Sequence, residues 1–350
     1  MPLVAFSVAL VASLALTMLV RHLALSWELV DHPGPRKVHA KPMPLLGGMA
    51  IYLAFVLGLL LALRREPMQQ VAGIVAGATL LAIVGLLDDG GLLHHQVKLF
   101  AGMPVASLFL LRGGIRARFF SEFVPGAAGA ALDIGLTVLW VVGITASFSI
   151  LDHMDGLCAG ISAVAALYFT ISAVLSGQTL VSALGAAVLG AALGFLRWNF
   201  NPAKIFMGDG GAMLLGFLMA TLGLKIRPEG VRFPLNWIMV ALILGVPVFD
   251  TTLISISRAR RGLLPFTSPG KDHTAHRLAS LGLSHRAAVV TLYGLAACFG
   301  SAALLIPHLG TGAAYLLAAL VACGGLAAIF LLEAVPYERQ VKLQKSSPAS

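Results

Sequence analysis

Two pairs of aspartates lie at the ends of apolar segments of the sequence. Asp88 and Asp89 directly follow the run Leu80–Leu87, and Asp152 and Asp155 lie between two further apolar runs. Adjacent carboxylates at the C-terminal end of a helix face an unfavourable dipole and repel each other. The same arrangement suits Mg²⁺ binding or a carboxylate with a raised pKa. Asp152 and Asp155 are three residues apart and share a helical face, although any single aspartate could equally be an ordinary loop charge.

A lysine and a dense polar segment add to this set. Lys98 could supply positive charge to a phosphate, or simply extend from a helix start to the membrane surface. The segment 199–211 contains Asn201, Lys204 and Asp209, together with a proline and several glycines that let backbone approach a ligand closely. Helix capping is the competing explanation for Asp209. Capping does not account for the asparagine and lysine before it.

A basic loop at 265–277 contains two histidines. His273 and His276 are three residues apart, but a zinc site needs a third ligand, and none with suitable spacing appears in the sequence. Contact with a diphosphate is the better interpretation of a set that includes Arg277. His153 could also donate to a phosphate, but we favour an incidental polar residue.

Long apolar segments separate these residues. Of 350 residues, 58% are hydrophobic and 11% charged, and the mean hydropathy is +0.91. Soluble domains carry about 25% charged residues, so this composition indicates a membrane protein. Apolar runs of about 17–22 residues are typical of transmembrane helices. The sequence predicts an all-α polytopic protein with about eleven transmembrane helices, at roughly 3–22, 46–63, 71–87, 96–112, 131–151, 157–176, 179–196, 211–225, 235–256, 287–306 and 312–333.

The distribution of Lys and Arg predicts the orientation. With the N-terminus outside and the C-terminus in the cytoplasm, Lys and Arg favour the cytoplasmic segments by about two to one. The net charge of +9 then reflects orientation and contact with anionic lipid or phosphate, not nucleic-acid binding. Five polar clusters fall on the cytoplasmic face, where we expect the active site: Asp31–Gly48, Asp88–Asp89, Asp152–Asp155, Asn199–Asp209 and Arg258–Arg277.

We predict one transmembrane domain over residues 1–336 and a polar, disordered tail over 337–350. The first apolar run lacks a basic flank and is longer than a signal-peptide core, so it is expected to be a retained span. The cysteines are interpreted as packing residues.

Acidic pairs and a basic loop on one face suit Mg²⁺-assisted phosphoryl transfer, in which the protein mainly positions phosphates and neutralises charge. The sequence contains no Walker motif, Rossmann glycine pattern or Gly-x-Ser-x-Gly elbow. Residue types alone therefore indicate a membrane enzyme, or an ion-coupled carrier, that handles anionic phosphates.

The motifs, in their order, resemble those of the polyprenyl-phosphate N-acetylhexosamine-1-phosphate transferases, glycosyltransferase family 4. The first motif combines Asp31-x-Pro33, Arg36-Lys37-x-His39 and Pro44-x-x-Gly47-Gly48. The others are Gly85-Leu86-Leu87-Asp88-Asp89 with Lys98-Leu99, Asp152-x-x-Asp155-Gly156-Leu157, Asn201-Pro202-Ala203 with Phe206-Met207-Gly208-Asp209, and His273-x-x-His276-Arg277-Leu278.

The resemblance implies an enzyme of the bacterial inner membrane. A polyprenyl phosphate would attack the β-phosphorus of a UDP-sugar, expected to be UDP-N-acetylglucosamine, and release UMP in the first membrane step of cell-envelope polysaccharide synthesis. Mg²⁺, with Mn²⁺ as the alternative ion, would be held by Asp89, Asp155 and Asp209. The expected catalytic residues are Asp88, as base, Asp89 and Asp209. The expected substrate-binding residues are Arg36, Lys37, His39, Lys98, Asp152, Asp155, Asn201, Lys204, His273, His276 and Arg277.

Some positions depart from the family pattern. Ala146 and Ser149 stand where relatives usually have asparagines, and a serine hydroxyl is a weaker Mg²⁺ ligand than an amide oxygen. Gly102 replaces a frequent glutamine, and the usual serine is missing from 210–212. Ala275 replaces the middle histidine of the pentapeptide-transferring relatives and argues against that activity.

Two alternatives stay open at this stage. A carrier for phosphorylated lipids or nucleotides should show inverted repeats with binding residues at the membrane midplane. A catalytically silent relative is suggested by Ser149. The expected partners are the lipid phosphate, the UDP-sugar and the membrane, and a homodimer is left open.

Overall fold

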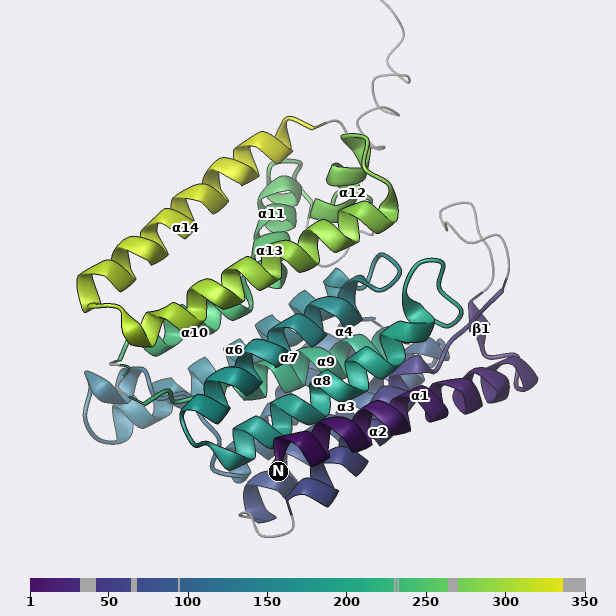
Figure 1. Cartoon of the computed structure of the whole chain (residues 1–350), viewed down its shortest axis with the longest axis horizontal. Helices are drawn as coiled ribbons and strands as arrows, with labels where there is room; N and C mark the ends of the chain where they lie inside the picture. Colours follow the sequence, from purple (N-terminus) through teal and green to yellow (C-terminus); the bar gives the residue numbers. More distant parts are fainter. Residues whose placement is uncertain are drawn as a thin grey trace, which may run out of the picture.

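Helices account for most of the chain that the structure describes, which comprises residues 1–31, 42–63, 68–93, 95–229, 231, 233–263 and 270–335 (Figure 1). It is a computed structural model. The helices are α1 (Pro2–Ser26), α2 (Gly47–Ala62), α3 (Met68–Asp89), α4 (His95–Val97), a π-helix (Lys98–Gly102), α5 (Met103–Arg112), α6 (Ala127–Leu151), α7 (Leu157–Leu175), α8 (Thr179–Asn199), α9 (Gly208–Lys225), α10 (Leu235–Ile243), α11 (Gly245–Ala259), α12 (Thr274–Ser280), α13 (His285–Leu305) and α14 (Thr311–Glu333). Short 3₁₀ turns occupy Phe120–Glu122 and Ile306–His308. Strands β1 (Val30–Asp31) and β2 (Met43–Pro44) pair antiparallel.

The predicted all-α membrane class is confirmed in its essentials. In the described residues, seven helices are long and apolar enough to cross a membrane, or eight if the bent pair α10 and α11 forms one span. The predicted count of eleven is not reached by this criterion, because α2, α5 and α9 are shorter or more polar. Only 6% of the most apolar 18-residue stretch of α14 is buried inside the protein, so its apolar surface suits contact with lipid.

The predicted span over 235–256 is not one straight helix. The chain bends by 79° between α10 and α11, at Leu244. Pro247 lies in the first turn of α11. Proline has no amide hydrogen and its ring clashes with the carbonyl four residues earlier, so a continuous helix cannot pass this point.

Helix α9 is the centre of the bundle, and every residue from Gly210 to Leu224 is buried. Helices α2, α3, α6 and α7 all pack against it. Small residues allow this close approach, as at Gly48, where an added Cβ would lie 2.3 Å from the backbone nitrogen of Gly211. The glycines at the start of α9 therefore bring the ends of α2 and α3 next to the residues that begin α9.

Helices α1 and α8 also approach each other closely through small residues. Gly190 and Gly194 are four residues apart on α8 and face the backbone of α1, where an added Cβ at Gly190 would lie 2.3 Å from the carbonyl oxygen of Phe6. Small residues at this spacing are typical of close helix pairs in membranes.

Replacing Gly85 by alanine is expected to destabilise the protein measurably. Its Cβ would lie 2.0 Å from the Cα of Gly210, which is backbone and can yield only if α3 and α9 separate. Overpacking of this kind costs about 1–3 kcal/mol. Gly135→Ala in α6 is the matched control, since nothing lies within 4 Å of its added Cβ. Thermal unfolding in detergent should show a lower midpoint for Gly85→Ala only, and equal midpoints would contradict the packing described here.

The polar clusters meet at one end of this bundle. Helices α3, α6 and α8 end there, and α7, α9 and α13 begin there. The β1–β2 hairpin joins the same end, because the amide of Phe206 donates to the carbonyl of Pro44 and the amide of Gly47 donates to the carbonyl of Phe206. Residues far apart in sequence thus surround a common space.

Candidate active site

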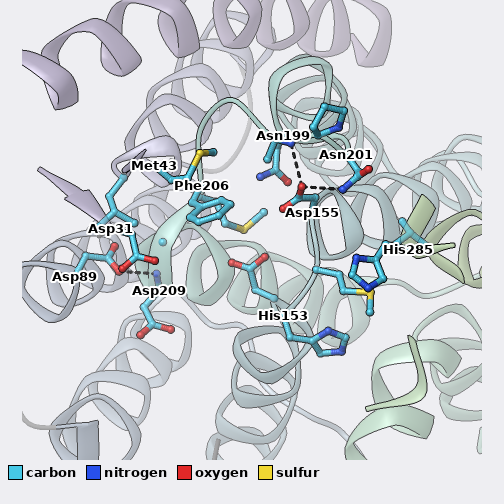
Figure 2. Close-up of a pocket in the computed structure, with 18 of the residues that line it drawn as sticks. Asp31, Met43, Asp89, His153, Asp155, Asn199, Asn201, Phe206, Asp209 and His285 are labelled. Carbon is cyan, nitrogen blue, oxygen red and sulfur yellow. Dashed lines mark hydrogen bonds between the residues drawn. The ribbon is translucent and has the colours of Figure 1, made fainter. Parts of the chain in front are cut away.

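A cavity of about 670 Å³ opens at this end of the bundle. That volume lies in the range of small-molecule sites. All five predicted clusters contribute to its wall. Figure 2 labels members of the first four. Among the lining residues are Asp31, Asp89, Asp152, His153, Asp155, Asn199, Asn201, Gly208, Asp209, Lys271, His276 and His285.

Asp89 and Asp209 lie together on one side of the cavity. An Oδ1 of Asp89 accepts a hydrogen bond of 2.8 Å from the backbone amide of Asp209 (Figure 2). Gly208, at φ 70°, makes the turn that permits this, and an added Cβ there would lie 2.2 Å from the Asp89 carboxylate. The glycine therefore has a steric reason to precede Asp209.

Lys98 connects the two acidic motifs. Its Nζ lies 2.7 Å from Oδ2 of Asp88 and 2.5 Å from Oδ2 of Asp209. Asp88 itself does not line the cavity, but Lys98 joins it to Asp209, which does. Lys98 is the first residue of the π-helix Lys98–Gly102. Such irregular helical turns are frequent at functional sites.

Ser149 lies at the place where the family pattern has an asparagine. Its hydroxyl donates to Oδ1 of Asp209 at 3.2 Å. The serine thus keeps an oxygen beside this carboxylate.

The α6–α7 turn supplies Asp152 and Asp155. Oδ2 of Asp155 accepts hydrogen bonds from the Asn201 side chain and the Ala203 amide, both at 3.0 Å (Figure 2). Burial raises the pKa of Asp152 to about 8, and the negative charges of Asp209, Asp89 and Asp155 add to the shift. Asp152 therefore lies within reach of the electrostatic influence of three other carboxylates at this end of the bundle.

Two of the predicted histidines form a group with His153. The ring centroid of His153 lies 3.8 Å from that of His273 and 4.8 Å from that of His276. Burial lowers the pKa of His276 to about 4 and that of His153 well below its usual value, and the nearby His273 lowers both further. His153 and His276 are therefore neutral near pH 7 and do not act as fixed cations toward a phosphate.

Known proteins resemble the chain along most of its length. The family described as Glycosyl transferase family 4 matches residues 71–227. A probable undecaprenyl-phosphate N-acetylglucosaminyl 1-phosphate transferase of Bacillus subtilis (strain 168) is 37% identical over 308 residues, which covers 87% of this chain and 84% of the relative. The chain belongs to glycosyltransferase family 4.

Other members of the family are similar at lower identity. A decaprenyl-phosphate N-acetylglucosaminephosphotransferase of Mycolicibacterium smegmatis (strain ATCC 700084 / mc(2)155) is 34% identical over 78% of this chain and 74% of the relative. An undecaprenyl-phosphate alpha-N-acetylglucosaminyl 1-phosphate transferase of Escherichia coli O157:H7 is 27% identical over 82% and 79%. The resemblance in the motifs is thus matched by a resemblance of the whole chain.

Arg277 does not reach the cavity in this family member. The residue is fully buried, and its guanidinium donates to the carbonyls of Asp272 and Leu332 and to the hydroxyl of Ser257. It also pairs with Glu333 at 2.7 Å. The structure gives Arg277 the role of joining α12 to α11 and α14, which differs from the expected diphosphate contact.

Lys204 also lies outside the cavity wall. Its side chain is exposed, with Nζ 5.5 Å from the ring centroid of Trp198. Arg36, Lys37 and His39 lie outside the described residues, as does the predicted tail.

Sequence reasoning missed several residues at the site. Asp31 lines the cavity from β1, and Lys271 and His285 line it from the segments on either side of α12. The position of Asp31 at the start of the first motif could have identified it as a site residue. Asp250 was not singled out because it lies within an apolar run, yet it is buried beside His273.

Proposed function

We propose that this protein transfers N-acetylglucosamine 1-phosphate from UDP-N-acetylglucosamine to undecaprenyl phosphate and releases UMP. The site would face the cytoplasm from the bacterial inner membrane, with the N-terminus outside and the C-terminus inside. Similarity over most of the chain to relatives with that activity in their names supports the reaction. The excess of Lys and Arg in the assigned cytoplasmic segments supports the orientation.

The observation that carries the proposal is the position of Lys98. It joins Asp88 to Asp209 at the edge of a cavity that carboxylates line. Phosphoryl transfer needs fixed positive charge beside the reacting phosphates and carboxylates that hold a metal ion. Both are present at one end of the bundle.

The carboxylates suit Mg²⁺, which prefers oxygen ligands. Asp209 and Asp89 are adjacent and line the cavity, and Ser149 adds a hydroxyl oxygen next to Asp209. Asp89 and Asp209 are joined directly through the Asp209 amide, whereas Asp155 pairs with Asn201 and the Ala203 amide. We therefore assign Asp155 to shaping the cavity and keep Asp209 and Asp89 as the metal-holding pair. Bound there, Mg²⁺ would neutralise the diphosphate and the developing charge on UMP.

The protein's own groups act on both phosphates. The nucleophile is an oxygen of the lipid phosphate, which forms a bond to the β-phosphorus while the bond from that phosphorus to the UMP oxygen breaks. A phosphate monoester has a second pKa of about 6 and is mostly dianionic at pH 7. Asp88 therefore needs only to accept the proton of the remaining monoanion. Lys98, with three donors, holds the phosphate oxygens near Asp209.

The test is a reconstituted reaction. Purified protein receives undecaprenyl phosphate, Mg²⁺ and a panel of UDP-sugars, and UMP release is measured. UMP is expected with UDP-N-acetylglucosamine and only when the lipid phosphate is present. Absence of UMP with every sugar would contradict the proposal and leave a silent relative or a carrier. Uptake of radiolabelled UDP-sugar into vesicles without UMP formation would identify the carrier.

Mg²⁺ binding is expected to strengthen as the pH rises from 6 to about 8. The raised pKa of Asp152 means that its carboxyl is largely protonated in the ion-free site at pH 7. A divalent cation favours the carboxylate, so binding releases a proton and affinity rises up to tenfold per pH unit below the pKa. Calorimetry in two buffers of different ionisation enthalpy measures that proton. Asp152→Asn should flatten the pH profile, and a flat profile in the unmodified protein would contradict the prediction.

A further inference from the structure

Three imidazole rings and one carboxylate meet beside the cavity. His153 comes from the α6–α7 turn, His273 caps α12, His276 lies in α12, and Asp250 lies in α11. Besides the two ring distances from His153 already given, the centroids of His273 and His276 are 6.0 Å apart. One ligand atom each from His153, Asp250 and His273 lies within 4.8 Å of the others. The sequence offered the histidine pair of α12 without a third ligand, and the fold supplies that ligand from a distant turn.

Asp250 fixes the tautomer of His273. Its Oδ1 accepts hydrogen bonds of 2.7 Å from the Thr274 amide and hydroxyl, and its Oδ2 lies 3.0 Å from Nδ1 of His273. A carboxylate held in this way is an acceptor, so Nδ1 of His273 carries the proton. Nε2 of His273 then keeps a lone pair for a ligand. A histidine oriented by a carboxylate is the usual arrangement around zinc.

His153 is a polar ring with no partner for either nitrogen. Both ring nitrogens are shielded from solvent and form no hydrogen bond within the described part of the chain. A buried polar group left unsatisfied costs about 1–3 kcal/mol. Coordination of a metal ion by one of these nitrogens would remove most of that cost.

We propose that His153, His273 and His276 form a binding site for a borderline-soft divalent cation, above all Zn²⁺, with Asp250 orienting His273. Imidazole nitrogens 2.0–2.1 Å from a tetrahedral zinc place the ring centroids about 5 Å apart. The observed distances are 3.8, 4.8 and 6.0 Å, so the rings already lie near that spacing, and His153 and His273 need to move apart by about 1 Å on binding. His153 and His276 also line the cavity, so a water or a ligand in the cavity can take the fourth position.

The buried carboxylate of Asp250 favours a cation over an anion among these rings. Asp250 is 2% exposed and adjoins His273, so a phosphate bound among the rings would be repelled. Mg²⁺ prefers oxygen ligands and belongs with Asp89 and Asp209. The site is thus distinct from the magnesium pair, and it does not depend on the proposed reaction.

Metal binding by the full-length protein in detergent tests the proposal. After removal of metals with a chelator, Zn²⁺ is titrated against a fluorescent zinc indicator, and Co²⁺ is added separately to record its visible absorption. One equivalent of Zn²⁺ and an intense tetrahedral Co²⁺ spectrum are expected. His153→Ala should weaken Zn²⁺ binding at least tenfold, and Asp250→Asn about 10–100-fold. His308→Ala is the control, because this exposed histidine lies beyond the far end of α13.

The ion-free melting temperature separates binding from folding. The ring nitrogens of His153 form no hydrogen bond that the substitution could remove, so His153→Ala without metal should melt close to the temperature of the unmodified protein. Equal Zn²⁺ affinity of His153→Ala and the unmodified protein, or Zn²⁺ displacement by equimolar Mg²⁺, would overturn the proposal. Binding of inorganic phosphate that His153→Ala abolishes, without Zn²⁺ binding, would overturn it in favour of an anion site. If His153→Ala does not fold, His276→Ala serves as the second variant with the same expectations.

Discussion

Asp209→Asn is expected to lower kcat for UMP release by about 10³-fold, the largest effect of any single conservative substitution in the cavity. Asp209 is the one carboxylate that contacts both Lys98 and Ser149, and its backbone amide also donates to Asp89. Asparagine keeps the shape and the backbone contact but removes the charge that would hold Mg²⁺ and position Lys98. Removing a single preorganised electrostatic group costs about 10²–10³ in kcat, and the loss of metal affinity adds to it.

Ser149→Ala is the matched control for this carboxylate. It removes the 3.2 Å hydrogen bond to Asp209 and leaves the charge. A hydrogen bond to a charged group contributes about 1.5–3 kcal/mol, so the expected loss in kcat is about 10–150-fold and stays below that of Asp209→Asn. Steady-state UMP release at saturating Mg²⁺ measures both variants. Full turnover by Asp209→Asn would remove Asp209 from the metal-holding pair, and a loss as large in Ser149→Ala would assign the metal contact to the serine.

The sequence predicts the polar end of the bundle better than its interior geometry. The aspartates at 88, 89, 152, 155 and 209 follow or precede apolar runs, and hydropathy alone indicates that such positions lie at helix ends. The bend at Leu244 was not predicted, because an apolar window averages over Pro247. The count of spans depends on the same averaging, since helix length and not local hydropathy decides whether α2 or α5 crosses a membrane.

Residues whose role depends on tertiary contact escape sequence reasoning for a physical reason. The distance from His153 to His273 is set by how the α6–α7 turn packs against α12, and no spacing rule covers a separation of 120 positions. The same holds for Arg277, which has the residue type of a phosphate ligand and yet is fully buried among carbonyls and Glu333. Burial, which only the fold reveals, decides whether a cation faces a ligand or holds helices together.

Asp272, in the loop before α12, is the buried ion-pair partner of Arg258 and Arg261. Asp272→Asn is expected to cost about 3–5 kcal/mol of folding free energy. Its oxygens accept from Nε of Arg258 at 3.1 Å, Nη2 of Arg258 at 2.9 Å and Nη2 of Arg261 at 2.7 Å. Arg258 is 4% exposed, so the substitution removes the Asp272 charge from beside a buried guanidinium. Thermal unfolding in detergent measures the loss. Arg260→Gln is the milder comparison at the same end of the bundle, because the Arg260 side chain is 63% exposed and its removal leaves Glu333 paired with Arg277.

The pH dependence of the stability difference between the unmodified protein and Asp272→Asn tests whether charge is its cause. The two arginines lower the pKa of Asp272 below its usual range, against about 3.9 in the unfolded chain. A carboxyl whose folded pKa is lowered contributes stability above the unfolded pKa and loses it as the pH falls toward the folded one. The stability gap between the unmodified protein and Asp272→Asn should therefore be constant from pH 8 to about 5 and narrow below about pH 4. Protonation of Asp272 removes the charge that the substitution also removes, so a gap caused by charge must narrow at low pH. A gap that is equally wide at pH 3 would mean that asparagine disturbs packing rather than charge.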